Sequence, residues 1–504
     1  MNNRIPRRPG LVGRGSVLAA RYSVLVLIAL TMAVSARASE LSDDLKARRA
    51  RVMEKLGPDA MLILWSAPPQ RYSLDIDYEY RQDSNLYYLS GLTQEGTILV
   101  LMPGNKTQRE LLFVKDRNPA REQWTGPLLT QAEAKAQTGI DRVFRSSEFD
   151  DVIAGLLMGA PVGGDAEPVD AAPFYGALAA GRARVALALG RRAIDQSLTP
   201  ELEFARRIRD RYVGFQVSDA SPILNGLRAV KTPYEQKILT KSVEISGEAQ
   251  MAGMRAAHPG AYEYEVLATI EAVQRGRGAV SWSYPSIVGS GPNATILHYP
   301  RGERQMQGGE LLLVDAACNY GYMAADITRT YPVNGTFSPL HKDIYQIVLQ
   351  AQDEAMKVAR PGASLQDVHN KTVDVIKAGL LKLGLITDTT GEQYKMWYTH
   401  GASHFLGIDV HDVGDRKGPL APGMAFTIEP GIYIRQSALD ALPRTAENNA
   451  LIEKIQPAAK KYADIGIRIE DSFLLESSGL RRLSSSVPRT IEEIEAFLKP
   501  KGSK

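Results

Sequence analysis

Three of the seven histidines in this chain of 504 residues lie within one short segment, at His400, His404 and His411. The residues between them are mostly small or apolar, and a fourth histidine, His298, lies in an apolar stretch upstream. Imidazole groups bind metal ions and carry protons near neutral pH. We therefore interpret these four as candidate ligands and proton carriers. The remaining histidines lie in or beside predicted helices and are expected to be structural: His258, His341 and His369.

Two aspartates belong to neighbouring predicted strands, at 311–315 and 326–332. In a symmetric hairpin that turns between Tyr320 and Gly321, Asp315 and Asp326 would face each other across the ladder. Like charges at opposed positions are destabilising, and a cation bound between them would remove the conflict. A surface hairpin with two solvated aspartates is the alternative interpretation of this pair.

Two glutamates are associated with other predicted strands. Glu429 follows an apolar strand and precedes a proline and a glycine. In the sequence Ile-Arg-Ile-Glu the isoleucines share one strand face, so Arg468 and Glu470 share the other. Glu470 can therefore point into a polar site with an arginine beside it.

Four carboxylates and one imidazole form the candidate ligand set: Asp315, Asp326, His404, Glu429 and Glu470. Such a set suits hard divalent ions such as Mn²⁺ better than the thiolate ligands of many zinc sites would. Because four carboxylates exceed what one dication needs, we predict two metal ions about 3.5–4 Å apart. Two ions can hold a hydroxide between them and polarise a carbonyl at neutral pH.

Other classes of chemistry lack their signatures in the sequence. There is no His-Glu-x-x-His, Gly-x-Ser-x-Gly or phosphate-loop motif. The single cysteine, Cys318, excludes an intramolecular disulfide, and its expected place at the hairpin tip favours a structural role. The net charge of +3 depends on six arginines in residues 1–38, so the rest of the chain is slightly acidic. No nucleic-acid partner is therefore expected.

Two similar pairs of helices are predicted around these residues. The sequence Thr232-Pro-Tyr-Glu235 is a capping box with proline at the first helical position, and it begins a helix that ends near residue 258. Another helix follows near 262–275. A second pair is predicted at 339–359 and 365–383, and the first helix of each pair ends at a Pro-Gly sequence.

The predicted strands repeat in the same way. Segments 309–315 and 423–429 each contain a glycine, a mostly apolar strand and a final carboxylate. We interpret residues 222–500 as one domain of two halves related by a pseudo-two-fold axis. A site between the halves would collect acidic residues from both.

The chain before this domain alternates short apolar runs with helical stretches over residues 40–217, which indicates an α/β domain. A helix is expected near 41–56. The other segments are predicted strands at 60–65, 97–102, 111–114 and 185–189, and predicted helices at 129–137 and 200–212.

Residues 1–38 have the three parts of a secretory signal peptide. An arginine-rich start precedes an apolar run at 24–34, which is too short to span a bilayer as a helix. Ala36-Arg-Ala38 then offers small residues for cleavage, so we predict an exported protein, periplasmic or secreted, that begins near Ser39. An uncleaved membrane anchor and twin-arginine export are the alternatives.

The motifs together resemble metallopeptidases of the pita-bread fold, specifically the aminopeptidase P and prolidase group. In chain order they are Ile296-Leu-His-Tyr299, Val314-Asp-Ala316, Asp326-Ile-Thr-Arg329, His400-Gly-x-x-His-x-Leu-Gly-x-Asp-Val-His-Asp412, Glu429-Pro-Gly431 and Arg468-Ile-Glu-Asp471. The amino-terminal domain resembles the same group through Arg81–Gly91 and Glu122–Gly126. The resemblance spans residues 40–500. It implies an α/β domain followed by an α+β catalytic domain of the creatinase and methionine aminopeptidase type.

The resemblance implies a role for each predicted ligand. Asp315 would bind one metal ion, and His404 together with Glu429 would bind the other. Asp326 and Glu470 would bridge the pair. Two divalent ions are expected, and Mn²⁺ suits these ligands best.

The resemblance also implies which residues face the substrate. His298 and His411 would hydrogen-bond the scissile carbonyl and the tetrahedral intermediate, and Arg468 is expected to bind substrate with them. Glu429 would act as general base, and His400 would line the pocket.

Members of this group cleave the peptide bond before proline, so the resemblance implies an Xaa-Pro aminopeptidase that forms a homo-oligomer, either a dimer or a tetramer. A polar insert at 435–462 resembles larger prolidases more than the usual bacterial aminopeptidases P. An Xaa-Pro dipeptidase is therefore the first alternative. A non-catalytic pita-bread binding module is a distant one, because all five ligand positions are intact.

Overall fold

The structure is a computed structural model that describes residues 40–161, 169–190 and 197–499. The chain divides between Ala220 and Ser221 into an amino-terminal unit and a carboxyl-terminal unit. The predicted signal peptide lies outside the described residues. Within the described ranges, no helix is both long and apolar enough to cross a membrane.

The amino-terminal unit is built on a six-stranded mixed sheet with the order β6-β5-β4-β1-β7-β8. The central strand β1 pairs antiparallel with β4 and parallel with β7. All four strands predicted from apolar runs are present in this sheet. Its strands are β1 (Ala60–Trp65), β4 (Ile98–Leu101), β5 (Glu110–Val114), β6 (Arg142–Arg145), β7 (Ala183–Leu187) and β8 (Phe215–Asp219).

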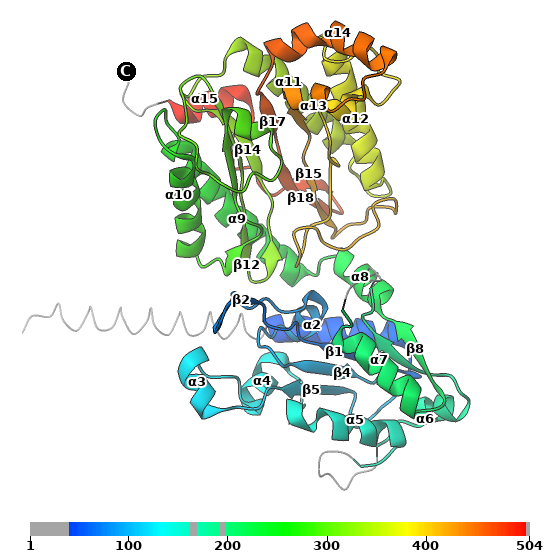
Figure 1. The fold of residues 1–504 in the computed structure, drawn as a ribbon. Helices are drawn as coiled ribbons and strands as arrows, with labels where there is room; N and C mark the ends of the chain where they lie inside the picture. Colours follow the sequence, from blue (N-terminus) through cyan, green and yellow to red (C-terminus); the bar gives the residue numbers. More distant parts are fainter. Residues whose placement is uncertain (1–39, 162–168, 191–196, 500–504) are drawn as a thin grey trace, which may run out of the picture. The chain divides into compact units, whose positions relative to one another are not determined.

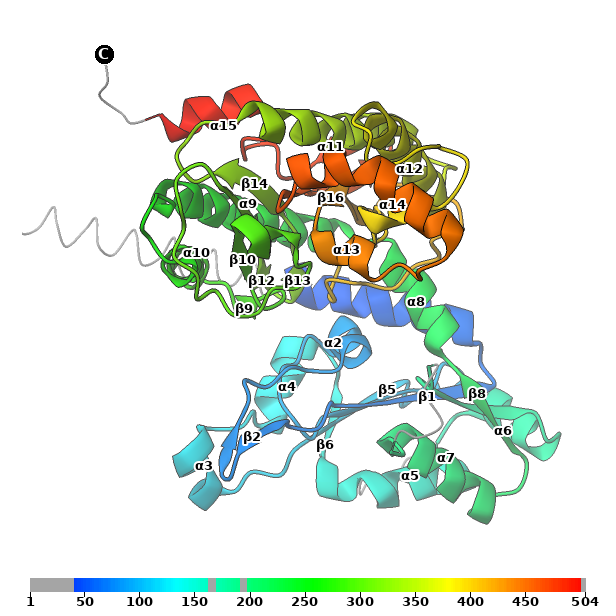
Figure 2. The ribbon, with the colours of Figure 1, turned by 45° about the horizontal axis from the view of Figure 1, so that its top comes forward.

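Helices cover both faces of this sheet (Figures 1 and 2). One face packs on the helices α5, α6 and α7, which share a buried apolar cluster with the strands. The other carries the helix over 40–56, α2 and α4. The remaining bounds are α2 (Ser84–Ser90), α3 (Pro119–Thr125), α4 (Gln131–Thr138), α5 (Phe149–Met158), α6 (Ala172–Ala179), α7 (Pro200–Arg211), and a small hairpin of β2 (Arg71–Ser73) and β3 (Ile76–Asp77).

The carboxyl-terminal unit contains the two predicted helix pairs. Both first helices begin at a side-chain cap followed by proline: Thr232 caps α9, with the predicted capping box, and Ser338 caps α11. Each first helix packs on its successor in sequence. The helices of this unit are α8 (Ser221–Ala229), α9 (Pro233–Ala256), α10 (Glu263–Gly276), α11 (Pro339–Val358), α12 (Leu365–Lys382), α13 (Gln436–Asp440), α14 (Ala446–Lys461) and α15 (Ile491–Leu498).

Antiparallel strands lie between these helix pairs, with β10-β11-β14 in one half and β15-β18-β19 in the other. A backbone bridge between Thr328 and Glu470 joins the halves. The strands are β9 (Ser281–Trp282), β10 (Ile287–Ser290), β11 (Leu311–Asp315), β12 (Cys318–Tyr320), β13 (Met323–Ala324), β14 (Thr328–Pro332), β15 (Ala425–Ile428), β16 (Gly431–Tyr433), β17 (Gly466–Arg468), β18 (Asp471–Glu476) and β19 (Gly479–Arg482). The arrangement agrees with the predicted pseudo-two-fold.

The predicted register of the hairpin that carries the two aspartates is wrong by two residues. Asp315 lies opposite Thr328, and Asp326 precedes β14 instead of opening it. The turn consists of Gly321 and Tyr322, which both have positive φ, of 57° and 63°. A two-residue hairpin loop with two positive φ angles matches strand twist, whereas symmetry alone cannot locate it.

One further expectation changes with this register. Cys318 is not at the hairpin tip but buried in β12, where its sulfur contacts the hydroxyls of Ser242 and Ser246 on α9.

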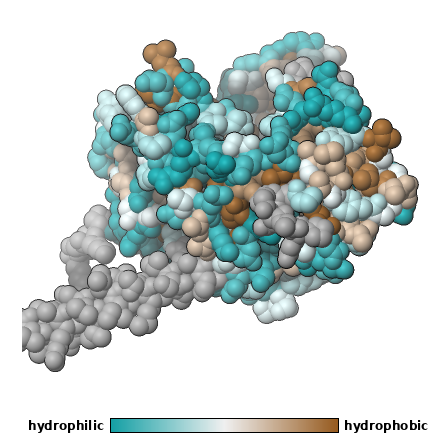
Figure 3. Space-filling view, turned by 90° about the horizontal axis from the view of Figure 1, so that it is seen from below, coloured by the Kyte–Doolittle hydropathy of each residue, from teal (hydrophilic) through white to brown (hydrophobic). Residues whose placement is uncertain are grey.

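The polar insert at 435–462 is largely helical, forming α13 and α14, and Ile455 of α14 is buried in the main core. The surface is mainly hydrophilic on the face seen in Figure 3, with hydrophobic side chains gathered at several places.

Candidate metal centre

Backbone pairing brings the predicted ligands together from distant parts of the carboxyl-terminal unit. Thr328 is opposite Asp315 in the ladder, and its carbonyl accepts a hydrogen bond of 3.1 Å from the Glu470 backbone nitrogen. In the other half, the Thr427 nitrogen donates to the His404 carbonyl at 2.9 Å, which aligns His404 with the end of β15, next to Glu429. Strand ends from both halves therefore converge on one place.

His404 is at the middle of this cluster. Its Nε2 atom lies 3.3 Å from Asp326 Oδ2, 3.4 Å from Glu429 Oε1 and 4.0 Å from Glu470 Oε1. Asp326, His404 and Glu470 each place a potential ligand atom within 4.8 Å of the others. Asp315 is linked to them through Tyr284, whose hydroxyl lies 2.5 Å from Asp315 and 2.6 Å from Asp326. The structure thus brings all five predicted ligands into one cluster.

Burial and mutual repulsion make this cluster unfavourable for four charged carboxylates. Burial, followed by the charges of Asp326 and Glu429, raises the pKa of Glu470 well above its usual value. The pKa of Glu429 is raised to about 7, mainly by burial, and that of Asp315 is raised for the same reason. The pKa of His404 is lowered by burial but raised more by Asp326 and Glu429, to about 9.

The donor set fits divalent cations. Carboxylate oxygens are hard ligands, and a buried group of them needs compensating positive charge beyond the one imidazolium that His404 can supply. Divalent ions between these oxygens would offset the mutual repulsion of the carboxylates. The structure therefore supports a metal centre at these residues.

Side chains behind the ligands hold them in place. Arg468 donates to Asp315 Oδ2 at 2.5 Å and to the Thr328 hydroxyl at 3.1 Å. The Thr328 hydroxyl in turn donates to Glu470 Oε2 at 2.7 Å. Such second-layer contacts fix ligand orientation. Sequence analysis missed Thr328 and Tyr284; strand alternation on β14 could have indicated the first, but no spacing marks the second.

Two of the predicted catalytic histidines lie against this cluster. The His400 Nε2 atom lies 2.8 Å from the Tyr433 hydroxyl, and its Nδ1 atom lies 3.7 Å from Glu429. Burial and then the charge of Arg468 lower the pKa of His400 to about 3. The His411 ring stands edge-on to His404, with centroids 4.3 Å apart, and burial followed by the charge of His404 lowers the pKa of His411. Both imidazoles are therefore neutral at pH 7.

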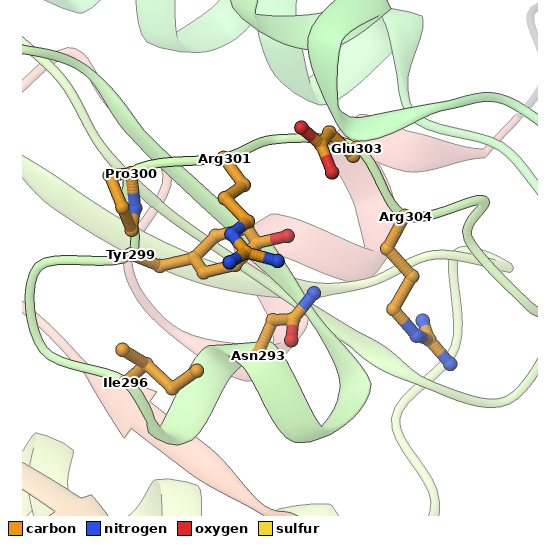
Figure 4. A pocket seen from close by; sticks show the side chains of 7 residues that line it. All are labelled: Asn293, Ile296, Tyr299, Pro300, Arg301, Glu303 and Arg304. Atoms are coloured by element: carbon orange, nitrogen blue, oxygen red, sulfur yellow. The ribbon is translucent and has the colours of Figure 1, made fainter.

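His298 lies on an exposed loop after the short turn Gly291–Thr295. It is close enough for its charge to lower the pKa of both His400 and His411. A pocket of about 440 Å³ adjoins it, lined by Asn293, Ile296, Tyr299, Pro300, Arg301, Glu303 and Arg304. In the view of Figure 4 the side chains of Tyr299 and Arg301 overlap, and that of Arg304 lies apart from them.

The remaining histidines have surroundings typical of structural residues. His369 Nδ1 accepts a hydrogen bond of 3.2 Å from the Ala402 backbone nitrogen, and this contact supports the segment that leads to His404. His341 is partly buried at the start of α11, where burial lowers its pKa. His258 is exposed, and its ring contacts the adjacent carbonyl of Pro259.

The sequence and the structure are similar to known peptidases over nearly the whole chain. Residues 237–477 match metallopeptidase family M24, and residues 45–162 match the N-terminal domain of aminopeptidase P. The Xaa-Pro aminopeptidase of Escherichia coli is 34% identical over 471 residues, which cover 91% of this chain and 98% of that protein. The Xaa-Pro aminopeptidase of Haemophilus influenzae is 30% identical, with 90% of this chain and 97% of that protein covered.

Solved structures agree with the sequence comparison. Aminopeptidase P from Escherichia coli, with the inhibitor Pro-Leu, has a TM-score of 0.75 and 32% sequence identity, and the match covers 91% of this chain and 98% of that one. The similarity includes both units, so it confirms the predicted combination of an α/β domain with a pita-bread catalytic domain. The chain therefore belongs to metallopeptidase family M24, within its aminopeptidase P group.

Proposed function

We propose that this protein is a metal-dependent Xaa-Pro aminopeptidase, which releases the first residue of peptides with proline at the second position. The observation that carries this proposal is the cluster of His404 with Asp326, Glu429 and Glu470 in a chain that is similar, over 91% of its length, to a protein named Xaa-Pro aminopeptidase.

Two divalent metal ions, most suitably Mn²⁺, are proposed for the centre. Asp315 would hold one ion and His404 with Glu429 the other, while Asp326 and Glu470 would bridge them. When bound, such ions supply Lewis acidity, which lowers the pKa of water and polarises a carbonyl. The requirement for more than one ion rests on the excess of carboxylates over the charge of a single dication.

The histidines and Glu429 are proposed to act on the substrate itself. An imidazole N–H at His411 or His298 can donate to the scissile carbonyl oxygen as it gains charge. Glu429 lies 3.4 Å from His404 and 3.7 Å from His400, and a carboxylate at this position can accept a proton from water and return it to the leaving nitrogen.

The proline ring is proposed to bind against His400, Tyr433 and Arg468. The Tyr433 hydroxyl contacts His400 at 2.8 Å and accepts from Arg468 at 2.9 Å, so the three side chains form one wall. The nitrogen of the Xaa-Pro bond is the proline's own tertiary amide nitrogen, which carries no hydrogen. An enzyme must therefore recognise the proline ring by its shape and not by a hydrogen bond from this nitrogen. Arg468 would thus contribute to substrate binding while it also positions Asp315.

Hydrolysis of matched tripeptides tests this function. The purified protein with Mn²⁺ should release free Xaa from Xaa-Pro-Yaa and leave Xaa-Ala-Yaa uncut, and a chelator should abolish the reaction. Equal cleavage of both peptides would contradict specificity for proline, and activity that survives chelation and dialysis would contradict the metal centre.

An Xaa-Pro dipeptidase is the second candidate, and the insert with α13 and α14 is the observation that favours it. A dipeptidase must bind the carboxylate that follows proline, so it needs a cation near the pocket. A non-catalytic binding module is disfavoured by the intact cluster of ligands.

We also propose that the protein is exported after cleavage near Ser39, on the basis of the charged, apolar and small-residue order in residues 1–38. Amino-terminal sequencing of the protein from its native source should find a start near Ser39. A chain that retains Met1 in the cytoplasm would overturn this proposal.

A homo-oligomer is proposed as well. The hairpin of β2 and β3 carries four exposed apolar or aromatic side chains: Tyr72, Leu74, Ile76 and Tyr78. Clustered exposed side chains of this kind are typical of protein interfaces. Light scattering of the purified protein should give the mass of a dimer or tetramer, and a monomer at micromolar concentration would contradict the proposal.

A further inference from the structure

Three charged side chains are buried together where the segment that carries His411 meets residues 228–231. The Lys231 Nζ atom lies 2.9 Å from Asp412 Oδ2, and an Arg228 guanidinium nitrogen lies 2.6 Å from Asp412 Oδ1. The exposed fractions of these side chains are 1% for Lys231 and Asp412 and 4% for Arg228. Burying charges is costly unless each one is paired and hydrogen-bonded, as these are.

The two cations come from a segment far from His411 in sequence. Arg228 is near the end of α8, and Lys231 lies just before the cap of α9. The Lys231 backbone nitrogen donates to the Gly423 carbonyl at 2.8 Å, and Val230 bridges to Met424 beside β15. The Lys231 ammonium also donates to the Arg228 carbonyl at 2.9 Å. Backbone pairing therefore fixes the place from which these cations reach Asp412.

The contact with Asp412 bears directly on the orientation of His411. The Asp412 backbone nitrogen donates to the Phe405 carbonyl at 2.9 Å, an isolated bridge that ties the end of this segment back to the residue after His404. The Asp412 carboxylate contacts its buried cations, while the ring of the adjacent His411 lies 4.3 Å from the His404 ring between centroids. The bridge and the ion pairs therefore fix the backbone from which the His411 ring extends.

The space around this anchor leaves little room for another arrangement. A methyl group added at Gly407 would come within 1.8 Å of the Asp412 carboxylate and within 2.9 Å of the Lys231 side chain. Arg228 additionally pairs with Asp409 of the same segment at 2.8 Å. Arg228 thus holds the segment 407–412 through both Asp409 and Asp412, and Lys231 holds it through Asp412.

We propose that Lys231 and Arg228 are positioning residues for His411, which act through the Asp412 carboxylate. The proposal rests on the proposed function, in which His411 donates to the developing charge of the substrate. A displacement of about 1 Å in a donor of this kind can cost roughly 10²-fold in rate. Removing a cation from this anchor should therefore slow the reaction although neither cation touches a metal ligand.

A double-mutant cycle tests this coupling on an Xaa-Pro-Yaa tripeptide. Lys231→Met should lower kcat by about 10- to 100-fold, with metal content and KM close to wild type. In a His411→Ala background the same substitution should change kcat less than about twofold, because the group it positions is gone. The matched control is Lys241→Met, an exposed lysine of α9 paired with Glu244, which should change neither background.

Amide hydrogen exchange of the metal-free protein supplies a second readout that needs no activity. Residues 405–412 should exchange faster in Lys231→Met than in Lys241→Met. If Lys231→Met does not fold, the isosteric Asp412→Asn takes its place in both experiments. Equal losses of kcat in the two backgrounds, or unchanged exchange over 405–412, would overturn the positioning role.

These outcomes are distinct from failure of the proposed function. A wild-type protein that cleaves no Xaa-Pro peptide would contradict the proposed function, and the exchange experiment would still decide whether the anchor holds the segment. If the wild-type protein cleaves the peptide but the effects of Lys231→Met and His411→Ala on kcat are additive, only the positioning role is contradicted.

Discussion

Glu470 illustrates at the scale of one residue why the centre requires cations. Its side chain is 2% exposed, and its neighbours include His404 at 4.0 Å and the Thr328 hydroxyl at 2.7 Å. Because burial, followed by the charges of the other carboxylates, raises its pKa well above the usual value, the metal-free cluster cannot ionise fully near neutral pH. Metal binding at this cluster must therefore compete with protons.

The Asp326→Asn variant separates metal binding from folding. The substitution removes a charge that repels Asp315 and Glu470 but keeps the shape of the side chain. We expect loss of activity and of bound metal, with the stability of the metal-free protein within about 1 kcal/mol of wild type. Metal analysis and thermal unfolding with and without Mn²⁺ measure both.

The control for this experiment is Asp353→Asn, at a half-exposed carboxylate on α11 that pairs with Arg489. That variant should retain its metal and its gain in stability with Mn²⁺. If Asp326→Asn still bound two ions per chain, the proposed bridging role would be refuted.

His411→Ala should reduce kcat with little effect on the metal. The ring lies beside His404 but is not needed to complete the cluster of four carboxylates and one imidazole. Loss of one donor to a developing oxyanion costs about 10²–10³ in kcat. Steady-state kinetics and metal analysis of the same preparation check this, and a loss of metal in proportion to the loss of rate would identify His411 as a ligand instead.

The stability of the metal-free protein should fall as pH rises from 6.5 to 9. The pKa of Glu429 is about 7 in the folded state against 4.5 normally, so its contribution to stability is complete below pH 4.5, is mostly lost by pH 6.5 and loses the remainder as pH passes 7. The pKa of His404 is about 9 against 6.5, so its contribution is also lost on raising pH towards 9.

His400 has the opposite dependence, but in a lower range. Its pKa is lowered from 6.5 to about 3, so its contribution is complete above pH 6.5 and is lost only as pH falls. Thermal unfolding of the chelated protein should therefore show a lower midpoint at pH 9 than at pH 6.5, and Mn²⁺ should reduce the difference. A midpoint that rises over this interval without metal would contradict the electrostatic description.

At the scale of elements, the sequence was sufficient for what depends on local signals. The capping box at Thr232 and the Pro-Gly sequences predicted helix ends to within a few residues. The hairpin register required the signs of φ at Gly321 and Tyr322, which hydrophobic pattern and symmetry do not encode. Asp315 and Asp326 nevertheless lie close together, and the Tyr284 hydroxyl contacts both carboxylates.

The supporting side chains were not predictable in the same way. Tyr284 and Lys231 belong to no motif, and the motif that contains Thr328 gives no sign of its contact with Glu470. The contacts of Thr328 and Lys231 join segments more than a hundred residues apart. Only tertiary packing shows which of many tyrosines, threonines and lysines serves the site. Residues that bind a metal have a restricted chemistry, whereas residues that position them do not.

The insert helices permit a prediction at this scale. Arg444 follows α13, and its side chain is 58% exposed with Asp440 at 3.8 Å, an arrangement typical of a weak surface ion pair. We expect Arg444→Ala to change kcat/KM for an Xaa-Pro dipeptide and for a longer peptide by less than about twofold, as should the control Lys454→Ala on α14. If Arg444→Ala alone lost cleavage of the dipeptide and kept cleavage of the longer peptide, this arginine would bind the carboxylate of a dipeptide substrate, as a dipeptidase requires.

At the scale of the whole molecule, the pseudo-two-fold explains why the ligands are so far apart in sequence. Each half contributes strand ends to one centre, with Asp315 and Asp326 from the first and Glu429 and Glu470 from the second. The similarity to the Escherichia coli enzyme covers 91% of this chain, so both units have counterparts in that enzyme. An aminopeptidase and a dipeptidase therefore differ in how they bind the part of the substrate that follows proline.

One comparison of substrates tests that distinction most directly. The purified protein with Mn²⁺ is given an Xaa-Pro dipeptide and an Xaa-Pro-Yaa-Zaa tetrapeptide with the same Xaa, and release of free Xaa is measured for each. Our account predicts that the tetrapeptide is cleaved, with a higher kcat/KM than the dipeptide. Cleavage of the dipeptide alone would make the protein a prolidase and contradict the account.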